Sequence, residues 1–121
     1  MPNSETAAVR SVEREVNAPL VQKRYEGKRS YDQVFVTIDG RVLDPRFDLR
    51  FHSPDGFEWG YGGSGPAQLA LALLADCLKD VNRALALYQE FKAKVVAGLP
   101  RDGWTLTEQE IRDAVSVCQE Q

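Results

Sequence analysis

The sequence is poor in the residues that most often hold metal ions or cross-link chains. It has one histidine, two cysteines and one methionine among 121 residues. A protein zinc site needs a cluster of Cys, His or acidic ligands at close spacing, and the sequence has no Cys/His cluster, so we expect neither a metal site nor a cofactor. Cys77 and Cys118 lie among apolar residues in helical patterns. That setting favours two buried free thiols over a disulfide.

Long apolar runs and a strong charge of one sign are also missing. No stretch reaches the roughly 18 consecutive apolar residues of a membrane-spanning helix, and the charges of Arg10, Glu13 and Arg14 interrupt any secretory signal. We therefore expect a cytoplasmic protein without a membrane partner. The 15 Lys and Arg against 18 Asp and Glu give a net charge of −3. This balance argues against a general nucleic-acid binder, which usually has a basic excess, but leaves room for a local basic patch.

The chain is long enough for one hydrophobic core. Residues 1–20 carry few large apolar side chains, and we expect a flexible or loosely docked arm there, followed by a single domain over residues 21–121. Residues 22–30 place four basic side chains around one tyrosine and one glycine. This composition predicts a solvated loop, with an anion contact by Arg24 and Arg29 as the alternative.

Two hairpins are expected next. Residues 33–38 are rich in β-branched and aromatic residues, and Asp39-Gly40 before residues 41–43 is a strong signal for a two-residue hairpin turn. Residues 47–51 and 57–61 alternate apolar and polar side chains, which predicts a second hairpin with a three-residue loop. Its register would pair Phe51 with Trp59 and would collect Arg50, His52 and Glu58 on the other face, with His52 opposite Glu58.

A glycine-rich corner connects this hairpin to a long apolar segment. Four of the nine glycines fall within residues 60–65, and residues 67–78 are apolar apart from Gln68 and Asp76. A helix that is apolar nearly all round is a buried central helix, with Ser64 or Gly65 as its cap and Pro66 as its first residue. The glycines either let this helix pack closely on the sheet, or present backbone N–H groups to an anion or partner. The residues in question are Gly62, Gly63, Ser64 and Gly65.

Two further helices follow. Val81, Leu85, Tyr88 and their successors at helical spacing predict a helix that stops near Gly98 and Pro100. Asp80 is placed to cap it. Thr107 to Glu110 forms a capping box for a last helix, whose buried stripe is Ile111, Ala114, Val115 and Cys118. The strands come first and the helices later, which predicts an α+β domain: an antiparallel meander of about four strands, packed on one face by two to three C-terminal helices.

No residue set satisfies the requirements of catalysis. Ser64 stands between a strand and a helix, but Pro66 occupies the position where a nucleophile elbow needs glycine. A triad of Ser64, His52 and Asp55 can be written, but His52 is expected on the surface beside Glu58. We therefore predict no catalytic residue, and a protein that is not an enzyme is favoured over an enzyme.

The run HSPDGFEWGYGGSGPAQLALA, residues 52–72, resembles a small family of uncharacterised prokaryotic proteins, a domain of unknown function. The resemblance extends from Tyr25 to the last helix and includes Tyr88, Phe91 and Trp104. Members occur in bacterial and archaeal genomes and on phages and other mobile elements. The resemblance implies a small soluble accessory protein carried by mobile DNA, and it brings no assigned reaction.

Two hypotheses of function follow. The first is a non-enzymatic accessory or regulatory protein that contacts another protein, such as an inhibitor of a host defence complex. Its contact residues would be the glycine corner and the face of Arg50, His52 and Glu58. The alternative is a small enzyme or ligand-binding domain that uses Gly62–Gly65 as an anion site at a helix N-terminus. Both hypotheses are compatible with a homodimer.

Overall fold

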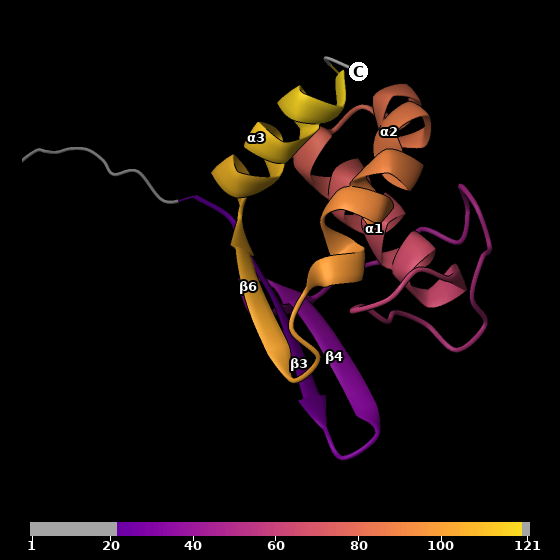
Figure 1. Cartoon of the computed structure of the whole chain (residues 1–121), viewed down its shortest axis with the longest axis vertical. Coiled ribbons are helices and arrows are strands. Elements are labelled where there is room, and N and C mark those ends of the chain that lie inside the picture. The colour runs from indigo at the N-terminus through magenta and orange to yellow at the C-terminus, as the bar shows by residue number, and fades with distance from the viewer. Residues whose placement is uncertain (1–21, 120–121) are drawn as a thin grey trace, which may run out of the picture.

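The computed structural model describes residues 22–119 of the chain, so the expected arm over residues 1–20 lies outside the described residues (Figure 1). The elements, in order, are β3 (Arg24–Ser30), β4 (Gln33–Ile38), β5 (Arg41–Val42), α1 (Ser64–Leu78), α2 (Val81–Lys94), the short 3-10 helix η1 (Val96–Gly98), β6 (Gly103–Thr107) and α3 (Glu108–Gln119).

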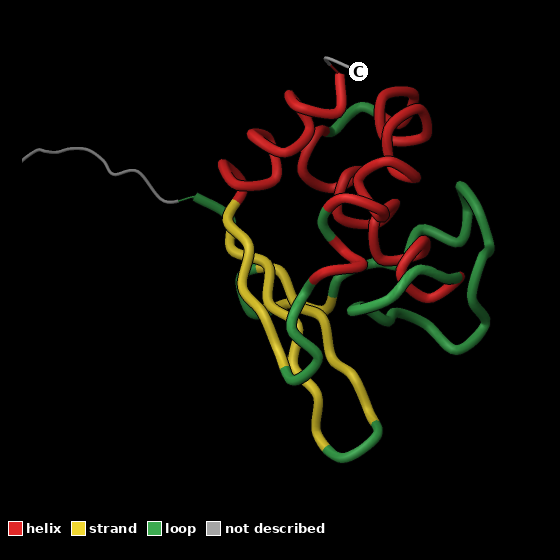
Figure 2. Tube along the Cα trace, viewed as in Figure 1, coloured by secondary structure: helices red, strands yellow, loops and turns green. Residues whose placement is uncertain are grey.

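The fold is α+β, as the order of the elements predicted. One antiparallel sheet has the strand order β5-β4-β3-β6. The first three strands form a meander, and β6 returns from the helical half of the chain to pair with the free edge of β3. The helices lie together on one side of this sheet (Figures 1 and 2). The face towards them is buried at Tyr25, Val36 and Trp104, while Lys28 and Phe35 on the other face are exposed.

The basic segment at residues 24–30 is a strand that lies between β4 and β6, so the prediction of a solvated loop is wrong. Tyr25 and Gly27 are buried on the face towards the helices, and Arg24 and Lys28 are exposed on the opposite face. The charges concealed a period-2 pattern, because a sheet with one solvated face accepts charged residues at alternate positions.

The first hairpin forms as predicted. Asp39 and Gly40 have φ values of 50° and 83°, both positive, and Ile38 pairs with Arg41 across them. Positive φ at both central residues is the geometry of a type I′ turn.

The second predicted hairpin does not form. Residues 43–63, here called the 43–63 loop, contain turns but no strand (Figure 2). Trp59 is buried, as expected, but Phe51, its predicted cross-strand partner, is 64% exposed. The alternation therefore predicted the wrong conformation, and of the apolar residues expected on one face Trp59 is buried while Phe47, Phe51 and Tyr61 are exposed.

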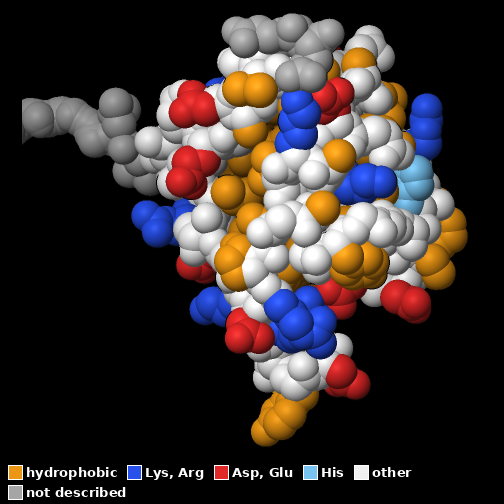
Figure 3. All heavy atoms as spheres, in the orientation of Figure 1, with side chains coloured by type: hydrophobic (Ala, Val, Ile, Leu, Met, Phe, Trp, Pro, Cys, Tyr) orange, Lys and Arg blue, Asp and Glu red, His pale blue; other side chains and the backbone are white. Residues whose placement is uncertain are grey.

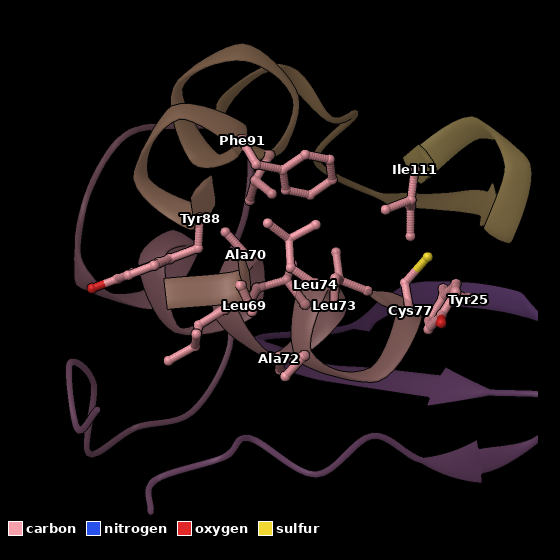
Figure 4. Close-up of a cluster of buried hydrophobic side chains, with 14 of the residues drawn as sticks. Tyr25, Leu69, Ala70, Ala72, Leu73, Leu74, Cys77, Tyr88, Phe91 and Ile111 are labelled. Atoms are coloured by element: carbon pink, nitrogen blue, oxygen red, sulfur yellow. The ribbon is translucent and has the colours of Figure 1, made fainter. Parts of the chain in front are cut away.

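Helix α1 is the centre of the core. Almost every residue from Gly65 to Leu78 is buried, as the apolar composition predicted. Figure 4 shows side chains of this helix directed at Phe91 of α2, Ile111 of α3 and Tyr25 of β3. The helix starts at Ser64, two residues before the predicted first residue Pro66, with Gly63 as its N-cap and no side chain that caps it. Cys77 and Cys118 are buried free thiols, as expected.

The caps of the later helices also match the sequence. Asp80 Oδ1 accepts the Arg83 N–H at 3.1 Å. In the capping box before α3, the Thr107 N–H donates to Glu110 Oε1 at 2.8 Å and the Glu110 N–H donates to Thr107 Oγ1 at 3.1 Å. Helix α2 ends at Lys94, before the predicted stop near Gly98, and the chain continues there as η1. Within residues 22–119, no helix combines the length and the apolarity that crossing a membrane requires.

Candidate functional site

A buried glutamine holds the 43–63 loop against the core. Gln68 of α1 is completely buried, and its Oε1 accepts the backbone N–H groups of His52 at 2.7 Å and Ser53 at 3.3 Å. Its Nε2 donates to the carbonyl oxygens of Pro45 at 2.7 Å and Arg50 at 3.0 Å. These four bonds use the full capacity of a side-chain amide. One side chain therefore satisfies four backbone groups of the loop, where a hairpin would use cross-strand bonds.

His52 joins the same loop to α2. Its Nε2 and the Tyr88 hydroxyl form a hydrogen bond of 2.7 Å, and the two rings lie 5.5 Å apart. The predicted pair of His52 and Glu58 is therefore wrong. Ser64 lines a hollow that His52 does not line. The hydrogen bond of the His52 Nε2 atom goes to Tyr88 and not to Ser64.

Glu58 is bound instead by Arg29 of β3. The guanidinium donates to Glu58 Oε1 at 2.7 Å and to Oε2 at 3.0 Å, and its Nε donates to the Arg101 carbonyl at 3.0 Å. It also lies 4.9 Å from the centre of the Trp59 ring. The hydrogen bonds from Arg29 lower the pKa of Glu58 below its usual value. The Arg29 side chain thus forms an ion pair within the protein, and this pair connects the 43–63 loop to the sheet.

The two arginines proposed for an anion contact lie on opposite faces of β3. The side chain of Arg29 is only 6% exposed and faces Glu58, while Arg24 is exposed and pairs through its backbone N–H with Asp39 Oδ1 at 2.9 Å. Strand residues separated by an odd number of positions point to opposite faces. Arg24 and Arg29 therefore cannot contact one small anion together.

The glycine corner combines packed and open positions. Gly60 has a φ of 87°, which favours glycine, and its N–H donates to the Val96 carbonyl at 3.0 Å. A Cβ on the buried Gly65 would lie 2.7 Å from Glu58 Cβ and 3.2 Å from its backbone nitrogen. Gly62 is exposed, and a Cβ there would meet nothing within 4 Å. The corner therefore packs α1 against the loop at Gly65 and remains accessible at Gly62.

A hollow of about 490 Å³ opens beside this corner. Its lining joins the start of α1 to the turn between β3 and β4, and all of its charged residues are acidic: Asp32, Asp55 and Glu58. Tyr61, Ser64 and Gly65 form the side towards the helix. The helix N-terminus by itself favours an anion, but carboxylates in the same hollow repel one. The electrostatics of the hollow therefore favour a basic or neutral group.

Two phenylalanines cover the outer surface of the loop. Phe47 and Phe51 pack edge to face with ring centres 4.9 Å apart, and they are 42% and 64% exposed. Arg46 and Asp48 beside them form an ion pair of 3.0 Å. The predicted hairpin placed both rings on one apolar face with Trp59, so the sequence reasoning missed them as surface residues. On the face of the molecule shown in Figure 3, acidic, basic and hydrophobic side chains are interspersed.

A polar cluster around Tyr25 also has internal partners, whereas the Trp104 Nε1 atom is buried without a hydrogen-bond partner among residues 22–119. The Tyr25 hydroxyl donates to Asp76 Oδ2 at 2.6 Å, and Lys23 Nζ lies 3.3 Å from the same oxygen. Burial raises the pKa of Tyr25 and that of the neighbouring Cys77 thiol. A thiol with a raised pKa is a poor nucleophile. No group of three or more His, Cys, Asp or Glu residues that could hold a metal ion occurs among residues 22–119.

The chain belongs to a family of unknown function (DUF6166), whose model matches residues 25–117. This confirms the resemblance that the run of residues 52–72 indicated. The chain matched none of the curated proteins and none of the solved structures with which it was compared. The description of this family names no function.

Proposed function

We propose that this protein is a small non-enzymatic binding protein that acts by contacting another protein through the 43–63 loop. The observation that carries the proposal is the exposed pair of Phe47 and Phe51 on a loop that Gln68 fixes to the core. Exposed apolar patches on a folded domain mark interaction surfaces. Aromatic side chains also contribute most of the energy in many protein interfaces.

The 43–63 loop is held in one conformation by contacts with three elements of the domain. It is attached to α1 through Gln68, to α2 through the hydrogen bond of His52 with Tyr88, and to β3 through the ion pair of Glu58 with Arg29. Binding a partner would therefore order few further backbone residues. A surface that is already fixed loses less conformational entropy on association, which favours affinity.

We propose that this protein is an accessory or regulatory protein of the cytoplasm. It would be carried by a mobile element and would inhibit a host defence complex. The small single domain supports this setting, as does the resemblance to proteins found on phages. Arg50 and the open Gly62 lie in the same loop as the phenylalanine pair and belong to the proposed contact surface.

A small enzyme or ligand-binding domain is the second candidate. The uncapped start of α1, at Ser64, is the observation that favours it, because unpaired N–H groups at a helix N-terminus attract anions. The carboxylates of Asp32 and Asp55 in the adjoining hollow repel an anion and count against this candidate. His52, the base written for Ser64 in the sequence, hydrogen-bonds to Tyr88 instead. The binding protein is therefore the better supported of the two.

Capture of partners from a lysate of the native host tests this proposal. Wild type, a Phe47→Ser/Phe51→Ser variant and a Val117→Ser control would be used as baits, since Val117 is 50% exposed on α3, away from the loop. We expect one protein or complex to be recovered with the wild type and with the control, and its recovery to fall about tenfold or more with the double variant. Equal recovery by all three baits, or no specific recovery, would refute the proposal.

A further inference from the structure

Strand β4 has an edge that is paired over only part of its length. Strand β5 contains two residues, Arg41 and Val42, which pair with Ile38 and Thr37. Beyond them, the N–H of Leu43 donates to the Val36 carbonyl at 3.1 Å, and the chain then leaves the sheet. From residue 33 to residue 36, β4 therefore has a strand neighbour on its β3 side only (Figure 2).

The register shows which backbone groups this edge presents. A two-residue turn joins Ser30 and Gln33, so Gln33, Phe35 and Thr37 direct their N–H and C=O groups towards β3. Val34 and Val36 direct theirs away from β3, as the bond from Leu43 to the Val36 carbonyl confirms. Among residues 22–119, no hydrogen-bond partner is found for the N–H and C=O of Val34 or for the N–H of Val36.

A groove runs along this edge. The hollow of about 490 Å³ touches the preceding turn at Asp32 and β4 at Gln33 and Val34, and a second hollow of about 300 Å³ touches β4 at residues 34–37. Both are closed on the far side by the same three loop residues, Asp55, Gly56 and Phe57. The second hollow is mainly apolar, with walls that include Val42, Leu43 and Pro45.

The charges along the groove have one sign. The first hollow contains Asp32, Asp55 and Glu58, and the second contains Asp55 as its only charged residue. Glu58 is neutralised by Arg29, whereas Asp32 and Asp55 are exposed. The groove is therefore complementary to a chain that carries a basic residue at one end and an apolar residue at the other.

We propose that the edge of β4 between Gln33 and Val36 binds an extended segment of the partner protein as an additional strand. Its backbone pairs with Val34 and Val36, a Lys or Arg of the segment enters the hollow of Asp32 and Asp55, and an apolar side chain enters the hollow beside Val42 and Leu43. Strand addition of this kind takes affinity from main-chain bonds and specificity from pockets for individual side chains. The inference rests on the proposed function and names the chemistry of the partner's segment.

The test is an NMR titration of isotope-labelled protein with a blocked heptapeptide of alternating arginine and valine. A glutamate–valine heptapeptide is the matched control. We expect shifts at the Val34 and Val36 amides, and binding of the arginine peptide about tenfold or more tighter than that of the glutamate peptide. An arginine peptide methylated on its backbone nitrogens should lose most of this affinity. No shift at these amides up to millimolar peptide, or equal binding of both peptides, would overturn the proposal.

Two variants locate the contact. Val34→Pro removes an N–H that points away from β3, a change that an edge strand tolerates, and should weaken the arginine peptide about tenfold. Asp32→Asn/Asp55→Asn should abolish the preference for arginine over glutamate while leaving the fold intact. Unchanged peptide binding in both variants would contradict the assignment. If the wild type is a dimer that Val34→Pro dissociates, a second copy occupies the edge and the basic segment is the wrong occupant.

The loop variant separates this inference from the proposed function. Phe47→Ser/Phe51→Ser should keep the peptide-induced shifts at Val34 while losing the captured partner. A partner that is still captured by Val34→Pro at the wild-type level would overturn the strand-addition proposal and leave the loop contact standing.

Discussion

Trp104 of β6 lies directly against the backbone of Gly27 of β3. The two residues are cross-strand neighbours, and the indole ring occupies the space that a Cβ at position 27 would need. The ring of Trp104 also packs edge to face on Trp59, with ring centres 5.6 Å apart. Trp59 Nε1 donates to the Pro100 carbonyl at 2.9 Å. The glycine therefore makes room for two tryptophans that join the last strand to the 43–63 loop.

Replacing this glycine should loosen both tryptophans. Gly27→Ala forces the Trp104 ring out of its position, and overpacking of this kind costs about 1–3 kcal/mol of unfolding free energy. Chemical denaturation followed by tryptophan fluorescence measures the loss. Gly98→Ala is the control, because a Cβ there would meet nothing within 4 Å. If both variants are as stable as the wild type, the contact between Gly27 and Trp104 is not as close as described.

The glycine corner gives a second matched pair. Gly65→Ala places a methyl group against Glu58, whose backbone nitrogen cannot move without shifting the loop, and we expect a loss of about 1–3 kcal/mol. Gly62→Ala should change the unfolding free energy by less than about 0.5 kcal/mol, because the position is exposed and open. Thermal unfolding of the two variants compares them. Equal effects would contradict the division of the corner into a packed and an open part.

The ion pair of Glu58 with Arg29 should make stability depend on pH. The pKa of Glu58 is lower in the folded protein than its usual value of 4.5, so the pair stabilises the fold fully above that value and loses its effect as the pH falls through the folded pKa. Glu58→Gln should therefore cost about 1–3 kcal/mol at neutral pH, and the difference from wild type should shrink below pH 4 or so. Urea denaturation at several pH values measures this.

Glu90→Gln is the control for this prediction. Glu90 forms an exposed pair with Lys94 one helical turn away, at 3.1 Å, and such pairs contribute about 0.5 kcal/mol or less. A Glu58→Gln variant whose deficit grows as the solution becomes more acidic would show that the sign of the pKa shift is wrong.

Local signals in the sequence predicted the parts of the fold that local chemistry determines. Asp39-Gly40 forms the two-residue turn that its sequence favours, and Thr107 and Glu110 form the reciprocal hydrogen bonds of a capping box. The apolar composition of residues 67–78 requires that this helix be buried on all sides. Strand β3 was missed because charged residues on its solvated face concealed the alternation, and because β6, one of its two neighbours in the sheet, pairs with it from about eighty residues further along the chain. A single-sequence pattern carries no information about such a partner.

The prediction of the second hairpin is wrong for a different reason. Residues 47–51 and 57–61 have the alternation of strands, but Gln68 supplies hydrogen bonds that a ladder would otherwise provide. Gln68 was visible in the sequence as a polar residue in an apolar helix, and a buried amide needs partners. That signal could have suggested a loop folded onto the helix. It could not have indicated that Phe47 and Phe51 would remain at the surface.

The central claim is that Gln68 fixes the 43–63 loop as a rigid surface, and amide hydrogen exchange tests it most directly. The His52 N–H donates to Gln68 Oε1, so its exchange should be slow in the wild type. In Gln68→Leu it should be about tenfold or more faster, while the amides that pair β3 with β4 keep their protection. Protection of His52 that survives the substitution, with the loop still closed on α1, would contradict the account.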